Sequence, residues 1–180
     1  EAAKAETQRP TLIVLRTIHI VAGVLWVGSA IFYLLFVEPT VKNLGPAGPK
    51  FMQDLIDRRR YPLFMNAVSA LTVLAGLFLY WMASGGLQMA WVLTGPGIGF
   101  TFGSLVALVV YAIGFFMLKP RAERMGKLGQ DIGRTGGPPT PEQAAELHTL
   151  GEEMTAIGRW DAILLTVSLI AMATARYWTF

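Results

Sequence analysis

Four long apolar runs separated by polar connections dominate the sequence. They cover residues 11–37, 61–83, 97–118 and about 159–178. The second and third runs contain no charged residue, and the first is interrupted only by Arg16 and His19. An α-helix of about 20 residues crosses a hydrocarbon layer of about 30 Å, so each run is long enough to span a membrane. The pattern predicts an all-α integral membrane protein, a four-helix bundle forming a single domain over residues 1–180.

The connections between the runs differ in charge, and the difference predicts on which side of the membrane each lies. The first and third connections are rich in Lys and Arg, whereas the second, residues 84–96, carries no charge. Basic loops are retained preferentially on the cytoplasmic side. We therefore expect the first and third connections to be cytoplasmic and both termini to lie outside.

The third connection is long and contains signals of its own. Residues 133–139 (GRTGGPP) predict a flexible break. Thr140 as N-cap, Pro141 at the first helical position and Gln143 then predict the start of a helix. Apolar residues recur at helical spacing after this start, at Leu147, Leu150, Met154 and Ile157. We expect an amphipathic helix in this connection, lying along the membrane surface or running directly into the fourth span.

The composition supports a membrane protein and excludes several kinds of site. Hydrophobic residues make up 53% of the chain and charged residues 15%, with a mean hydropathy of +0.48; soluble domains average about 25% charged residues. Cysteine is absent, which excludes disulfides, thiolate metal sites and cysteine nucleophiles. The net charge of +3 comes from basic residues between the spans and not from a nucleic-acid-binding motif. The expected partner is the lipid bilayer, with a homodimer or a larger membrane complex left open, and no nucleic acid is expected.

His19 is the principal candidate site residue, because ionisable groups inside a span are costly. It lies about eight residues into the first span, or roughly 12 Å at 1.5 Å per residue. Gly23, Trp26 and Tyr33 share its helical face, and Arg16 lies one turn towards the outer end. The small Gly23 would let a flat ligand or another helix come close. Four interpretations are open: an imidazole bonded to a carbonyl or hydroxyl of another helix, an axial haem ligand, a copper ligand, or a proton-relay or quinone site.

Further candidate ligands are predicted near the outer ends of the spans. Arg16 and Arg176 are candidates for binding haem propionates, and Arg176 is equally suited to reach lipid phosphates. The second axial position of an iron would be filled by Met172 or Met82, filled by His19 of a second protomer, or left empty. A copper-handling protein would use His19 with Met82, Met89 or Met172, since thioethers suit Cu(I). A non-catalytic accessory or anchor subunit is the third possibility.

Other polar and small residues in the spans have predicted structural roles. Interhelical hydrogen bonds are expected from Asn66, Ser69, Thr101 and Ser104. A small-residue face begins the third span and serves either close helix packing or the approach of a planar cofactor (Gly95, Gly97, Gly99, Gly103 and Ala107). We expect Asp161 to pair with a cytoplasmic arginine or to cap a helix, with a proton-transfer role as the alternative. His148 is expected to pair with Glu152 in solvent, on the opposite side of the membrane from His19.

Three segments carry a resemblance to a known group of proteins. Residues 18–28 (IHIVAGVLWVG), and residues 57–62 (DRRRYP) leading into 75–81 (AGLFLYW), resemble small bacterial membrane proteins. These include the membrane domain of copper resistance protein D and the membrane-bound protoporphyrinogen oxidases unrelated to the flavin enzymes. In the oxidase group the histidine of the first helix is associated with haem b, a role that the resemblance implies for His19.

The resemblance also has a departure that bears on activity. The oxidase group carries a lysine within its third helix, whereas this chain has none before Lys119 at the end of the third span. The resemblance therefore implies a haem b-binding protein of the bacterial inner membrane with a redox or electron-transfer role. It does not carry the oxidase activity over to this chain.

Overall fold

The computed structural model describes the backbone of residues 2–180 and the side chains of residues 9–45 and 47–180. This described part is helical, without a β-strand. Four helices are long and apolar enough to cross a membrane: Arg9–Asn43, Tyr61–Ala83, Gly95–Thr135 and Pro141–Tyr177. These helices confirm the predicted all-α fold and fit a multi-pass membrane protein in a lipid environment. The bundle and the outward placement of both termini stay predictions.

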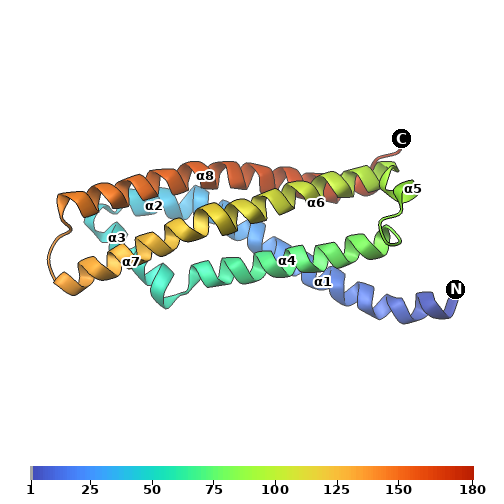
Figure 1. The fold of residues 1–180 in the computed structure, drawn as a ribbon, viewed down its shortest axis with the longest axis horizontal. Coiled ribbons are helices and arrows are strands. Elements are labelled where there is room, and N and C mark those ends of the chain that lie inside the picture. Colours follow the sequence, from blue (N-terminus) through green and yellow to red (C-terminus); the bar gives the residue numbers. More distant parts are fainter. Residues whose placement is uncertain (1) are drawn as a thin grey trace. The chain divides into compact units, whose positions relative to one another are not determined.

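Several of these long helices are built from consecutive segments (Figure 1). The first comprises α1 (Ala2–Phe32), the π-helical turn η1 (Tyr33–Val37) and α2 (Glu38–Asn43). A short connection follows, made of η2 (Gly45–Ala47), α3 (Gly48–Gln53) and η3 (Asp54–Arg58). The second helix is α4 (Tyr61–Ala83), followed by the single turn α5 (Met89–Val92). The third joins α6 (Gly95–Ile113), η4 (Gly114–Leu118) and α7 (Lys119–Thr135), and the fourth joins α8 (Pro141–Thr174) and η5 (Ala175–Tyr177).

The chain divides into two compact units, and each long helix contributes residues to both. The first unit contains residues 2–28, 67–111 and 163–180, and the second contains residues 29–66 and 112–162. The uncharged turn around α5 belongs to the first unit, whereas both basic connections belong to the second.

In the first unit, α6 and α8 approach each other through small residues. A Cβ atom at Gly99 would lie 2.8 Å from the Cβ of Ala175, and one at Gly103 would lie 2.7 Å from the Cγ of Met172. Ser168 of α8 donates a hydrogen bond of 2.8 Å to the carbonyl of Gly103. Small faces and hydroxyl bonds of this kind hold membrane helices together. Of the two predicted uses of the glycine face, the structure therefore shows helix packing, since α8 and η5 cover it at Gly103 and Gly99.

A second interhelical contact in the first unit joins α4 to α6. The Tyr80 hydroxyl lies 2.5 Å from Oγ1 of Thr101, which in turn donates to the carbonyl of Gly97 at 2.6 Å. Trp91 meets the Tyr80 ring edge-on, with 5.5 Å between ring centroids. The predicted interhelical role of Thr101 is confirmed. Asn66, by contrast, donates to the carbonyl of Pro62 in its own helix.

In the second unit, α7 and the first half of α8 form an antiparallel helical hairpin (Figure 1). Arg124 donates two hydrogen bonds to the carboxylate of Glu146, at 2.6 and 2.9 Å. Arg121 donates to Glu153 at 2.7 Å. Gly136 ends α7 with a left-handed backbone, φ 66°, where glycine carries no steric penalty. The predicted break at 133–139 is thus the turn of a hairpin only from Gly136 onward, because residues 133–135 still belong to α7.

In the third connection the structure confirms the predicted start of α8 and adds a helix, α7, that was not predicted. The start of α8 is as expected: the backbone N–H of Thr140 donates to Gln143 at 2.9 Å, and that of Gln143 to Thr140 at 3.3 Å. From there α8 runs directly into the fourth span. The helix α7 was missed, because the apolar run ends at residue 118. Ala, Glu, Lys, Arg and Met continue the helix beyond it, since they favour helical backbone whatever their polarity.

Candidate functional site

His19 lies where α1 faces α4 in the first unit. Its Nδ1 is 2.8 Å from the backbone carbonyl oxygen of Thr72. A carbonyl oxygen accepts hydrogen bonds only, so Nδ1 carries the proton and Nε2 of the neutral imidazole carries the lone pair. The contact realises the first of the four interpretations, an imidazole bonded to a carbonyl of another helix. It also settles which nitrogen is available to a ligand.

Gly76 of α4 makes room for the imidazole. A Cβ atom at Gly76 would lie 2.9 Å from Cε1 and 3.1 Å from Nδ1 of His19. One turn along α1, a Cβ atom at Gly23 would be 3.5 Å from Cγ2 of Thr72. The predicted role of Gly23, close approach of another helix or of a flat ligand, is therefore taken by α4. The hydrogen bond to Thr72 fixes the ring of His19, and the missing side chain at Gly76 leaves the space that the ring fills.

The second ring nitrogen of His19 is free. Within the described residues Nε2 has no hydrogen-bond partner, and the side chain is partly exposed. Trp26 and Ala22 on the same face of α1 are each 5% exposed, so this face is turned inward, as its spacing predicts. A histidine whose Nδ1–H is fixed by a carbonyl and whose Nε2 is open has the arrangement of a metal-ligating imidazole.

The other predicted ligands do not gather around His19 among the described contacts. Met172 packs against Gly103 of α6. Arg176 lies over the ring of Tyr177, with 4.6 Å between its Cζ and the ring centroid. Arg16 is exposed on α1. In the part of the chain that the structure describes, no three His, Asp or Glu side chains come together to hold a metal ion.

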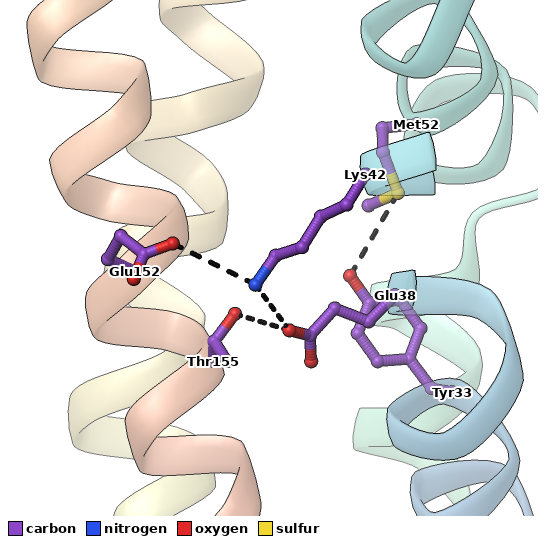
Figure 2. Close-up of polar contacts among 6 residues, drawn as sticks. All are labelled: Tyr33, Glu38, Lys42, Met52, Glu152 and Thr155. Carbon is purple, nitrogen blue, oxygen red and sulfur yellow. Dashed lines mark hydrogen bonds and ion pairs between the residues drawn. The ribbon is translucent and has the colours of Figure 1, made fainter. Parts of the chain in front are cut away.

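Sequence reasoning missed a polar cluster in the second unit, shown in Figure 2. Oε1 of Glu38 accepts a hydrogen bond of 2.8 Å from the Thr155 hydroxyl and lies 2.9 Å from Nζ of Lys42. The same Nζ lies 3.8 Å from Glu152. The Glu38 side chain is 12% exposed, against 49% for Lys42 and 61% for Glu152. The cluster ties α2 to α8, and its one local signal is a carboxylate directly after the first apolar run.

Two tyrosines extend the polar contacts of the second unit. The Tyr33 hydroxyl donates weakly to the sulfur of Met52, at 3.9 Å (Figure 2). The rings of Tyr33 and Tyr61 are stacked with centroids 5.7 Å apart, and the Tyr61 hydroxyl donates to the carbonyl of Ser29 at 3.1 Å. Tyr33 was predicted to share the face of His19, and its described contacts are instead those of the second unit. These contacts assign it a packing role.

Two predicted pairings are wrong. Glu152 faces Lys42, and the described part holds no ion pair between Glu152 and His148. Asp161 lies in the middle of α8, so it caps no helix. It is 7% exposed, and its Oδ1 has neither a hydrogen bond nor an ion-pair partner among the described residues. Asp161 adjoins the start of the fourth apolar run, where a cap was expected, but α8 continues through this position from Pro141 to Thr174.

The His19 pair with α4 and the Glu38 cluster both join separate segments of the chain through polar side chains. In the first, Nε2 of His19 has no partner among the described residues, whereas in the second the carboxylate of Glu38 is paired with Lys42 and Thr155. Comparison with known proteins adds no assignment: the chain matches no protein-family model, and no curated protein or solved structure is significantly similar to it.

Proposed function

We propose that this chain is a membrane-embedded haem b-binding protein with an electron-transfer role, in which Nε2 of His19 is the axial ligand. The observation that carries the proposal is the 2.8 Å contact between Nδ1 of His19 and the carbonyl of Thr72. This contact selects the neutral tautomer with the lone pair on Nε2, and an iron ligand must offer that lone pair.

The contacts of His19 fix the orientation of its imidazole ring. Thr72 and Gly76 hold the ring in place, so little conformational entropy is lost when Nε2 binds. Arg16 is exposed one turn away on α1 and is the nearest candidate for a propionate. A haem would supply a one-electron iron couple, and the chain would hold it and tune its potential through this apolar setting. The copper alternative gains no support, because Met82, Met89 and Met172 make no described contact with His19.

The test is the visible spectrum of the detergent-purified protein from haem-supplied cells, oxidised and reduced. The wild type should show a Soret band and a reduced α-band, and His19→Ala should lose both. His148→Ala is the matched control, because it removes the other histidine of the chain, which is exposed on α8. A colourless wild type, or equal loss in both variants, would refute the proposal.

A further inference from the structure

Three consecutive arginines stand directly before α4 in the second unit. Arg58 ends η3, and Arg60 is the last residue before the helix begins at Tyr61. The side chains of Arg58 and Arg59 are 84% and 76% exposed, and Arg60 is exposed as well. We call these three residues the arginine triplet. It places a concentrated positive charge at the end of a membrane-spanning helix.

The carboxylates of the same segment do not neutralise the triplet. Asp54 is shared by Arg58, at 3.6 Å, and Arg59, at 3.5 Å. Exposed pairs at such distances contribute little. Asp57 is also exposed in this turn, and neither it nor Arg60 forms an ion pair within the described residues. Three guanidinium groups thus face two carboxylates, and the excess charge is open to an outside anion.

The backbone of Arg60 is in a conformation that arginine rarely adopts. Its φ is 52°, in the left-handed region, where a side chain is disfavoured by about 1 kcal/mol or more and glycine is not. The carbonyl of Arg60 accepts the N–H of Phe64 at 3.0 Å and so begins α4. Glycine would make this turn with less strain. An arginine at this position therefore points to a use for its guanidinium group.

An exposed apolar surface on the first turn of α4 directly follows the arginine triplet. Leu63 and Phe64 are both exposed large hydrophobic residues, directly after the triplet in a helix that is long and apolar enough to span a membrane. Acyl chains would cover these side chains, and lipid phosphates would then lie at the level of the arginines. Guanidinium groups bind phosphate through paired hydrogen bonds.

We propose that the arginine triplet, with Leu63 and Phe64, binds an anionic phospholipid. The triplet would hold the headgroup phosphate, and the two apolar residues would contact the acyl chains. A lipid is favoured over free phosphate because the apolar surface adjoins the charge and has no use in binding an inorganic anion. This site is independent of haem binding, since it involves none of the residues around His19.

The experiment uses the full-length protein in nanodiscs made of phosphatidylcholine, with or without phosphatidylglycerol, and in detergent with titrated lipid. Lipid affinity is measured by native mass spectrometry and the unfolding midpoint by a thermal shift. The variants are Arg60→Gly and the triple change of the triplet to Gln. The matched control is Arg134→Gln, which removes an arginine of the second unit that is 79% exposed and lies in the last turn of α7.

Phosphatidylglycerol should bind the wild type more tightly than phosphatidylcholine does. Each arginine removed from the triplet should cost about fivefold in affinity, corresponding to about 1 kcal/mol per basic residue. Arg60→Gly should lose this affinity without losing stability in detergent, because glycine relieves the left-handed backbone. Arg134→Gln should bind as the wild type does.

Three results would overturn the proposal. One is equal affinity for the two lipids in the wild type. Another is an equal loss in Arg134→Gln and the triplet variants, which would show a general charge effect. The last is stabilisation by inorganic phosphate as strong as that by phosphatidylglycerol, which would show an anion site without lipid recognition. Arg60→Gly with unchanged lipid affinity would remove Arg60 from the site.

Discussion

Gly76→Ala should displace His19, and this substitution tests the site most directly. The added Cβ would stand 2.9 Å from Cε1 and 3.1 Å from Nδ1 of His19. Both distances are below ordinary van der Waals contact, and both atoms belong to a ring that is held by the carbonyl of Thr72. The ring therefore has to rotate or shift away from α4, and the 2.8 Å hydrogen bond is lost.

The expected size of the effect follows from three contributions. Overpacking of this kind costs about 1–3 kcal/mol, and the lost hydrogen bond costs about 1 kcal/mol. Replacing glycine by alanine within a helix gains about 1 kcal/mol. The net loss for Gly76→Ala is therefore about 1–3 kcal/mol of unfolding free energy.

Gly28→Ala is the control, because Gly28 lies in α1 of the same unit and no atom beyond its own turn of helix is within 4 Å of its Cβ position. It carries the helix-propensity gain without the clash. Unfolding midpoints in one detergent should fall for Gly76→Ala and stay level or rise for Gly28→Ala. In haem-loaded protein, Gly76→Ala should also shift the Soret band, since the ligating ring has moved. Equal stability of the two variants would show that the ring of His19 does not rest on Gly76.

Three further predictions concern the packing and the polar groups of α8. Gly103→Ala should lower the unfolding free energy by about 1–3 kcal/mol in a denaturant titration, because α8 covers that position; Gly158→Ala, with open space at its Cβ position, should not. Asp161→Asn should raise the unfolding midpoint at mildly alkaline pH, since it removes a buried carboxylate charge that has no described partner; a lower midpoint would reveal a cation bound there. Thr155→Val should cost about 1 kcal/mol, and in a double-mutant cycle with Glu38→Gln the two changes should not be additive.

Features with a local cause were predictable. Hydropathy located the four helices, and the second predicted span coincides with α4, because an apolar run of about 20 residues is by itself long enough to cross a bilayer. The start of α8 at Thr140 and Gln143 follows from hydrogen bonds between residues three apart. The inward face of α1, with Trp26, follows from helical periodicity.

Features that depend on a distant partner were not predictable. The carbonyl that fixes His19 is 53 residues away and belongs to the backbone, which leaves no signal in residue types. The hydroxyl that binds Glu38 is 117 residues away. The glycine face of α6 was compatible with a helix or a cofactor until α8 was found to cover it.

The sequence by itself therefore determined that four helices of membrane-spanning length form, where α4 and α8 begin, and that His19 lies on an inward face. Only the tertiary structure decided which nitrogen of His19 bonds to a carbonyl and that Glu38 is paired with Thr155. It also showed that Oδ1 of Asp161 has no partner among the described residues. The physical reason is that helix formation and membrane insertion depend on interactions and transfer free energies of residues that are close together in the sequence. Partner choice is governed by the packing of helices distant in sequence, where Gly76 and Gly103 matter through the volume they leave empty.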